Sequence, residues 1–504
     1  MSLYLLGIDI GTSACKVALF SNDGAVAAQA SAEYPVYYPS PGWAEQCPVS
    51  WWKAVCGAIK KILEESDIPT SSIAGVGIDG QSWSAIPLSK SEGVLSNTPI
   101  WMDTRASDIC ARLRGTIGDQ AFFEVSGNPL QPSYSMPKVL WYKENLPDVY
   151  KKADTILQSN SYIAYCLTGE VTQDLSQGYG YQCFDIHTGN WNKELCTEIG
   201  LRYELLPEIV PSHQVIGKVT KNAAAECGLR EGTPVVAGGL DAACGTLGAG
   251  VLNNGETQEQ GGQAGGMSIC MDKCIAHPKL ILGYHVVPNR WLLQGGTVGG
   301  GGVLRWFEQE FGAEERMRAE EHGTNSFHEL GLLAEKVPLG CEGLVFLPYM
   351  AGERSPIWNP DAKGVYYGLD YRKTRGHMVR ASMEGVVYSL LHNLNTAEEA
   401  GAKVSRMRAM GGAANSHFWT QMKSDITGKP IDVPMADTAT TLGAAMLAGV
   451  GVGLYDSFDD AVKKTVTIKR SHIPDNTHHK TYQETYETYI ALYNHLAPLM
   501  NMGS

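Results

Sequence analysis

YLLGIDIGTSACKVALF, residues 4–20, is the stretch that decides the fold. Two apolar runs flank the turn residues Gly11-Thr12-Ser13, and a second turn at residues 21–24 leads into another short apolar run. The pattern predicts strand, tight turn, strand, turn and strand. Because no helix separates these strands, the opening differs from that of a Rossmann dinucleotide-binding fold.

The same arrangement recurs about half a chain later, where residues 257–272, TQEQGGQAGGMSICMD, form a strand, a glycine-rich turn and a strand. A chain of 504 residues is too long for one hydrophobic core. The sequence therefore predicts an α/β fold of two related domains, residues 1–250 and 251–504, with a cleft between them. Further expected elements are a helix at 51–65, a strand at 73–80, strand–loop–helix units at 233–250, 290–312 and 406–428, and a final small-residue helix at 440–453.

Composition limits the classes of partner. The net charge of −13 argues against nucleic acid and against an anionic membrane surface. The 12 cysteines contain no CxxC pair, so we expect reduced thiols in a cytoplasmic chain. The start lacks a secretory pattern, and the longest apolar stretch, residues 442–454, is too short and too rich in glycine to span a bilayer.

An acidic residue and a turn stand together at the first hairpin. Asp9 ends a buried strand, and Gly11-Thr12-Ser13 can direct N–H and hydroxyl groups at an anion. A carboxylate in that position needs a cation, which Mg²⁺ on a nucleotide would supply, and Lys16 adds positive charge. The alternative is an ordinary hairpin with an Asx-type turn.

Asp241 stands in a second unit of this kind, VVAGGLDAACG, where a strand meets a glycine bend and then a helix of small residues. A carboxylate at a helix start can serve as a general base that takes a proton from a sugar hydroxyl. Asp is also a favoured N-cap residue, so a purely structural role is the alternative, and both roles can hold in part.

Three glycine loops, at residues 261–266, 299–302 and 411–415, could approach a nucleotide closely. Close backbone packing at strand–helix turns explains each loop equally well. The GxGxxG-like spacing within the second loop is weak evidence for a nicotinamide site, because no acidic residue follows at the end of a next strand. Neither a P-loop nor the protein-kinase motif set is present.

Polar and aromatic residues form a candidate polyol site. Amide, carboxylate and guanidinium groups satisfy hydroxyls, while indole and phenol rings cover the apolar face of a sugar. A lone buried Trp more often belongs to a core, but the neighbouring polar groups favour a sugar site. The candidates are Gln81, Ser82, Trp83, Trp101, Asp103 and Tyr134, together with Asp241.

The chain resembles the FGGY carbohydrate kinases, and within them the xylulokinase branch. GIDIGTSACKVALF resembles the first phosphate loop of the actin-like ATPase superfamily. Residues 364–385, GVYYGLDYRKTRGHMVRASMEG, fit the second FGGY signature, while residues 134–145 resemble the first signature but have Tyr142 where an aliphatic residue is usual. Residues 346–356, FLPYMAGERSP, look like the corresponding xylulokinase segment. The resemblance extends from about residue 4 to about residue 455.

This resemblance implies two actin-like (ribonuclease H-like) ATPase domains flanking a central cleft, with ATP and Mg²⁺ as cofactors. It places the sugar and the first phosphate loop in the N-terminal domain and the nucleotide in the C-terminal domain. Asp241 would be the catalytic base, and Asp9 and Asp241 would face the metal ion. A homodimer is a further expectation. The nucleotide would contact Gly11, Thr12, Ser13, Lys16, Gly262, Gln263, Gly301, Gly411, Gly412 and Asn415.

Two departures from the family pattern bear on the substrate. Relatives often carry Gly-Thr in the second phosphate loop, where this chain has Gly262-Gln263. Xylulokinases carry Met-His after Gly-Gln, where this chain has Ser82-Trp83, and it also lacks the Arg-Glu of glycerol kinases. D-xylulose is the leading expectation, with ribulose, erythritol or gluconate as alternatives. A non-kinase actin-like ATPase and a nicotinamide dehydrogenase are the rival classes.

Overall fold

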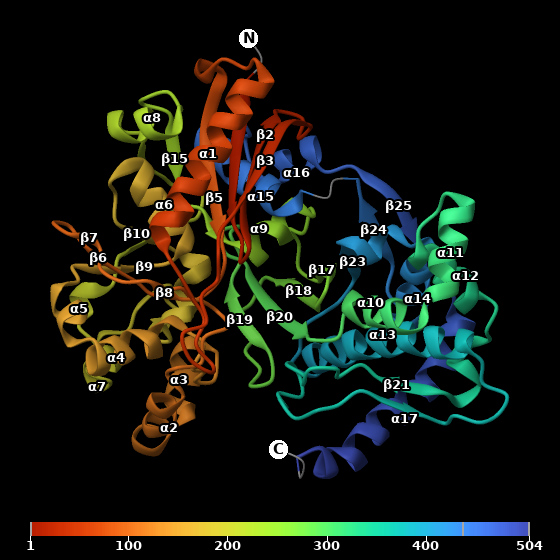
Figure 1. Ribbon diagram of the computed structural model, residues 1–504. Coiled ribbons are helices and arrows are strands. Elements are labelled where there is room, and N and C mark those ends of the chain that lie inside the picture. Colours follow the sequence, from red (N-terminus) through yellow and green to blue (C-terminus); the bar gives the residue numbers. More distant parts are fainter. Residues whose placement is uncertain (1–2, 436–437, 502–504) are drawn as a thin grey trace.

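The computed structural model, which describes residues 3–435 and 438–501, has two lobes, each built on a mixed β-sheet (Figure 1). The first sheet occupies the red-to-yellow lobe and has the order β14-β15-β5-β1-β2-β3, with β16 also paired to β5. Its strands are β1 (Tyr4–Ile10), β2 (Ala14–Ser21), β3 (Val26–Glu33), β5 (Ile73–Gly80), β14 (Val215–Lys218), β15 (Pro234–Val236) and β16 (Gly239–Leu240).

The second sheet lies in the green-to-blue lobe and has the order β19-β20-β18-β17-β23-β24-β25. Its strands are β17 (Glu256–Gly261), β18 (Gly265–Met271), β19 (Ile281–Tyr284), β20 (Trp291–Thr297), β23 (Arg406–Met410), β24 (Ile431–Pro434) and β25 (Ile468–His472).

The two main sheets have the same arrangement of paired strands at their centres. In the first sheet, β1, β2 and β3 are antiparallel neighbours, and β5 joins β1 in parallel. In the second sheet, β17, β18 and β20 are antiparallel neighbours, and β23 joins β17 in parallel. The predicted recurrence of the glycine-turn hairpin is therefore confirmed at the level of strand pairing.

Helices cover both sheets, and the expected helix at residues 51–65 is present as α1. No helix of the described residues is long and apolar enough to cross a membrane. The helices are α1 (Pro48–Ser66), α2 (Ser107–Thr116), α3 (Asp119–Ser126), α4 (Ser135–Asn145), α5 (Pro147–Lys152), α6 (Ser159–Thr168), α7 (Lys193–Glu198), α8 (Lys221–Cys227), α9 (Asp241–Gly248), α10 (Gly301–Phe311), α11 (Ala313–His322), α12 (Ser326–Glu335), α13 (Arg375–Glu399), α14 (His417–Thr427), α15 (Ala439–Gly451), α16 (Phe458–Thr465) and α17 (Asn476–Met500).

Short strands form small ribbons beside the two main sheets. They are β4 (Glu45–Gln46) with β8 (Thr98–Pro99); β6 (Ile86–Ser89) with β7 (Gly93–Val94) and β9 (Thr155–Leu157); β10 (Thr172–Asp174) with β13 (Glu208–Val210); β11 (Phe184–Asp185) with β12 (Asn190–Trp191); and β21 (Val345–Leu347) with β22 (Val365–Tyr367).

Two helices of small residues, α9 and α15, pack against each other where the lobes join. Helix α15 comes late in the chain, yet it also packs on β1 and β5 of the first sheet (Figure 1). A Cβ added at Gly443 would lie 1.9 Å from the carbonyl oxygen of Cys244, and one at Gly7 would lie 2.0 Å from that of Thr441. Because the backbones touch, these positions accept only glycine, which explains the small-residue composition.

Candidate active site

Three carboxylates gather at the carboxyl ends of neighbouring strands of the first sheet. Asp9 on β1 is directly beside Asp79 on β5 in the parallel register. Strand β16 pairs with β5 at the same place, with Gly239 beside Asp79, and Asp241 follows as the first residue of α9. Asp9 and Asp241, predicted from separate parts of the sequence, therefore share one site, and Asp79 is a third member that the sequence interpretation missed.

The three carboxyl groups repel one another in a buried setting. Asp9 is 6% exposed and Asp79 is fully buried. Burial is the largest cause of the raised pKa of Asp9, and Lys16, whose Nζ lies 3.9 Å from Asp9 Oδ2, opposes it. The pKa of Asp79 is raised well above its usual value by burial and by the charges of Asp9 and Asp241. Within the described part of the chain, the one hydrogen-bond partner of the Asp79 carboxyl group is the carboxyl group of Asp9, a contact that raises the pKa of Asp79 and lowers that of Asp9.

Asp241 combines partial exposure with a strongly shifted pKa. Burial, followed by repulsion from Asp9, raises the pKa of Asp241 to about 7, and the backbone N–H of Ala242 opposes the shift by donating to Asp241 Oδ1 over 2.6 Å. The N-cap position of α9 is Leu240, so Asp241 is the first helical residue instead of the N-cap, and its structural role is limited to accepting the Ala242 N–H of the first turn. A carboxylate that titrates near neutral pH and remains accessible is suited to general-base catalysis.

The first hairpin turn is held by contacts from Trp101, a candidate of the polyol site, and from Gln46. Trp101 Nε1 donates to Thr12 Oγ1 over 2.9 Å, and Gln46 Nε2 donates to the backbone oxygen of Thr12 over 2.7 Å. Ser13 is exposed, and Gly11 and Thr12 are partly exposed. The Thr12 hydroxyl accepts from Trp101 and keeps its own hydrogen for donation to a ligand.

An aromatic cluster lies beside this turn. The Trp83 ring is 4.5 Å from that of Tyr134 and 6.2 Å from that of Tyr179, measured between ring centroids. Burial is the largest cause of the raised pKa of Tyr179, and the charge of Asp241 adds to it, so the cluster adjoins the carboxylates. Ser82 next to Trp83 is partly exposed, and Gln81 Oε1 is buried with no hydrogen-bond partner among the described residues. Tyr179 was not predicted, because no motif surrounds it.

Asp103 has a structural role within the protein. Its carboxylate is fully buried, accepts from the backbone N–H of Ala44 and forms a bidentate pair with Arg105, whose Nε donates to Oδ1 and whose Nη2 donates to Oδ2. Arg105 in turn lies 4.0 Å from the ring centroid of Trp43 and 4.8 Å from that of Trp141. The prediction that Asp103 contacts the sugar therefore finds no support in the geometry.

A large cavity of about 880 Å³ opens in the second lobe. Gly262, Gln263, Gly301, Gly412 and Asn415 line it, which brings together five of the positions predicted for the nucleotide. Gly411, the sixth predicted position in this lobe, packs against a residue that lines the cavity: a Cβ there would lie 2.9 Å from the backbone oxygen of Gly261. The apolar side chains that the sequence interpretation missed come from α10, α12 and α14 and include Leu304, Phe327, Leu332 and Phe418.

The glycine loops fit together at the start of α10. The backbone N–H of Gly301 donates to the oxygen of Gly262 over 2.8 Å, and that of Gly302 donates to the oxygen of Gln263 over 2.9 Å. A Cβ at Gly302 would lie 2.3 Å from Gln263 Nε2, so the Gln263 side chain covers the first turn of this helix. The close packing that explains these glycine loops is therefore present, and Gly262 and Gly301 also line the cavity.

Comparison with known proteins gives the site its context. The chain is 30% identical over 498 residues to the xylulose kinase of Bacillus subtilis (strain 168), covering 98% of each chain. It is 32% identical over an alignment of 521 positions to the autoinducer-2 kinase of Yersinia pseudotuberculosis serotype O:3 (strain YPIII), covering 99% of this chain and 96% of the relative. The gluconate kinase structure from Lactobacillus acidophilus matches with a TM-score of 0.92 at 26% identity and covers 100% of both chains.

Family matches extend over most of the chain. Residues 4–248 match the N-terminal domain of the FGGY family of carbohydrate kinases, and residues 269–452 match its C-terminal domain. With the structural match, they confirm the expected fold of two actin-like ATPase domains. The division at residue 250 stays a prediction. The chain belongs to the FGGY family of carbohydrate kinases and is a sugar kinase.

Proposed function

We propose that this sugar kinase transfers the γ-phosphoryl group of ATP to a hydroxyl of a ketopentose, with D-xylulose as the first candidate. The observation that carries the proposal is the meeting of Asp9 and Asp241 at the ends of strands β1 and β16, which flank β5, where burial and repulsion from Asp9 raise the pKa of Asp241 to about 7. One carboxylate is thereby poised to accept a proton at neutral pH, while the other, beside Lys16, faces the phosphate turn.

In the proposed reaction, Asp241 takes the proton from the attacking sugar hydroxyl. The sugar oxygen forms a bond to the γ-phosphorus as the bond from that phosphorus to the bridging oxygen of ADP breaks. Positioned general-base catalysis typically contributes about 10²–10⁴-fold. Most of the remaining acceleration would come from alignment and from stabilisation of charge on the phosphoryl oxygens.

The nucleotide is proposed to occupy the cavity of about 880 Å³, with its base among the apolar side chains of α10, α12 and α14. Its phosphates would extend along the glycine turn at residues 261–265 toward the turn at residues 11–13. Thr246 on α9 donates from Oγ1 to Gln258 Oε1 on β17 over 2.8 Å, which ties the helix that begins at Asp241 to the strand that leads into the second turn. This hydrogen bond holds α9 and β17 together, which supports a path for the phosphates from one turn to the other.

The residues present fit a magnesium ion carried by the nucleotide. Among the described residues, no group of three or more His, Cys, Asp or Glu side chains is arranged to hold a metal ion. Mg²⁺ in phosphoryl-transfer enzymes is commonly bound by one or two carboxylates together with substrate phosphates and water. Asp9, and beside it Asp241, would supply these carboxylates. When bound, the ion would neutralise developing charge on the phosphates.

The side chains proposed for the sugar favour a neutral acceptor. They are uncharged except for Asp241, and the nearby Arg105 is already paired with Asp103 and with Glu45. The carboxylate of gluconate would be repelled by Asp241, and the side chains proposed for the sugar offer it no counter-charge. A ketopentose or a small polyol avoids that cost, because it carries no charge and its hydroxyls can bond to partly exposed groups such as Ser82.

The test is a coupled ADP-release screen with ATP and Mg²⁺ across ketoses, polyols and aldonates. We expect the largest stimulation with D-xylulose and little with gluconate. A preference for gluconate would overturn the substrate proposal, and ADP release indifferent to every sugar would favour a non-kinase ATPase activity. Cytoplasmic location and a homodimer stay predictions.

A further inference from the structure

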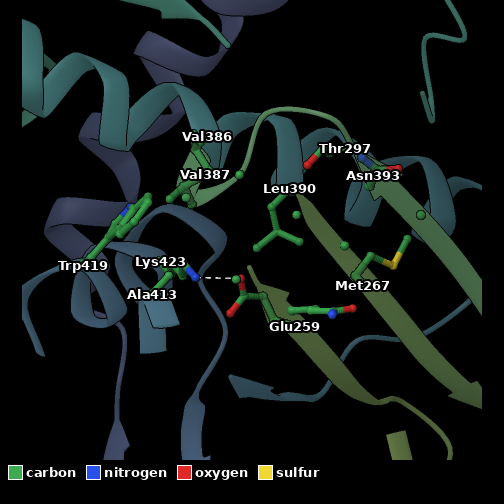
Figure 2. A pocket seen from close by; sticks show the side chains of 17 residues that line it. Glu259, Met267, Thr297, Val386, Val387, Leu390, Asn393, Ala413, Trp419 and Lys423 are labelled. Atoms are coloured by element: carbon green, nitrogen blue, oxygen red, sulfur yellow. Dashed lines mark hydrogen bonds and ion pairs between the residues drawn. The ribbon is translucent and has the colours of Figure 1, made fainter. Parts of the chain in front are cut away.

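A buried ion pair lies directly behind the glycine turn of the second hairpin. Lys423 on α14 extends to Glu259 on β17, and Lys423 Nζ lies 2.6 Å from Glu259 Oε1 (Figure 2). The side chains are 2% and 5% exposed, respectively. Residues 164 apart in the chain are thus joined inside the second lobe.

This pair is separated from the nucleotide cavity by a thin wall. Lys423 and Glu259 line a small cavity of about 20 Å³, and Gly261, Ala413 and Trp419 border both this cavity and the large one. A Cβ added at Gly261 would lie 3.0 Å from Lys423 Nζ and 2.7 Å from Ala413 Cβ. The Lys423 ammonium therefore lies against the backbone of the turn that is proposed to hold phosphate.

A contribution to folding stability does not by itself explain why a charged pair is buried at this place. Glu259 Oε2 and Asn393 Oδ1 belong to residues that line the small cavity, and both atoms are buried without a hydrogen-bond partner in the described ranges. A buried ion pair whose oxygens are incompletely satisfied is often no more stabilising than two apolar side chains of similar volume. What such a pair does provide is a fixed geometry between the two elements that carry it.

We propose that the Lys423–Glu259 pair is a positioning device that fixes the phosphate-binding turn at residues 261–265 against α14, the wall of the nucleotide cavity. The inference rests on the proposed function of that cavity. Glu259 lies two residues before the turn, and Lys423 lies on the helix that follows the loop at residues 411–416. The pair spans the two walls between which the phosphates would enter, so its loss should weaken phosphate binding while leaving the site for the base intact.

The experiment compares binding of ADP-Mg²⁺ and adenosine by calorimetry, which requires no knowledge of the sugar. The decisive variant is the double substitution Glu259→Met with Lys423→Met, which removes both charges and retains volume. The matched control is Glu398→Met with Lys429→Met, which removes a more exposed pair of the same chemistry (2.7 Å) whose members do not line the cavity. If the first variant fails to fold, Glu259→Gln with Lys423→Met also leaves no buried charge and replaces it.

We expect the affinity of the variant for ADP-Mg²⁺ to fall on the order of tenfold, with adenosine affinity unchanged, because a displacement of about 1 Å in a positioning group can cost up to about 100-fold. The control should match the wild type for both ligands. Equal affinity for ADP-Mg²⁺ in variant and wild type, or equal losses for both ligands, would show that the pair is only structural and overturn the inference. A wild-type chain that binds neither ligand would instead remove the proposed nucleotide cavity itself, and the inference with it.

Discussion

Asp9 and Asp79 stand side by side in register on two parallel strands, each as the third residue of the same tripeptide, Gly-Ile-Asp. The register aligns Gly7 with Gly77 and Ile8 with Ile78, so the two carboxylates come out at the same edge of the sheet. Asp9 has some exposure and Lys16 nearby, whereas Asp79 is fully buried behind it. The pair is therefore asymmetric, with Asp9 the more accessible carboxylate and Asp79 buried beside it.

This asymmetry predicts a ranking of two isosteric substitutions. Asp9→Asn should lower turnover by about 100-fold and raise the Mg²⁺ concentration needed for half-maximal rate, while Asp79→Asn should cost about tenfold, in the range known for outer-shell partners. Steady-state rates with Mg²⁺ titrated at fixed ATP check the ranking. An Asp79→Asn variant more damaged than Asp9→Asn would reverse the assignment of which carboxylate faces the metal ion.

Sequence patterns predicted the two hairpins because glycine turns between apolar runs are local signals. They missed Asp79 because it sits inside a buried strand, although the repeated Gly-Ile-Asp was a usable sign. They also assigned Asp103 to the sugar, whereas the structure pairs it with Arg105. The Lys423–Glu259 ion pair could not be predicted from sequence patterns, because no local signal indicates which charged residues 164 positions apart will come into contact.

The pKa of Asp241 predicts the pH dependence of catalysis. A general base must be ionised, so the rate at low sugar concentration should rise with pH through about 7 and level off above it. Asp241→Asn should abolish transfer and leave ADP binding near normal. A pH–rate profile for the wild type and calorimetry for the variant check both points, and near-normal turnover by the variant would remove Asp241 from this role.

The same pKa shift predicts that catalytic competence lowers stability. The folded-state pKa of Asp241, about 7, lies above the ordinary 3.8. Between these values the folded chain holds a proton that the unfolded chain has released, so stability falls as pH rises through this window. Asp241→Asn removes the penalty. At pH 8 the variant should be more stable than the wild type by on the order of 1 kcal/mol, and at pH 4 the difference should vanish. Thermal unfolding at both pH values measures it, and a pH-independent difference would contradict the assignment.

Backbone contact between α9 and α15 predicts a severe effect from one methyl group. In Gly443→Ala the new Cβ would meet the carbonyl oxygen of Cys244 at 1.9 Å, so the helices must separate at a cost of about 1–3 kcal/mol or more. The control is Gly57→Ala on α1, where a Cβ meets no atom within 4 Å. That change should stabilise by about 0.5–1 kcal/mol. Chemical denaturation of both variants provides the comparison, and equal stabilities would exclude a tight junction.

Substitutions of Trp83 give the last prediction. The effect of its backbone conformation on stability can be measured separately from the effect of its ring on sugar binding. Its φ of 61° is left-handed, which costs an L-residue roughly 1–2 kcal/mol and costs glycine nothing. Trp83→Gly and Trp83→Ala both delete the ring that packs on Tyr134 and Tyr179. Both should therefore raise the KM for the sugar to a similar degree, on the order of tenfold, with the KM for ATP unchanged. The glycine variant should be the more stable of the two by roughly the cost of the left-handed backbone. If the alanine variant were more stable, the backbone strain would be absent, and an unchanged KM for the sugar in both would place Trp83 in the core rather than at the substrate.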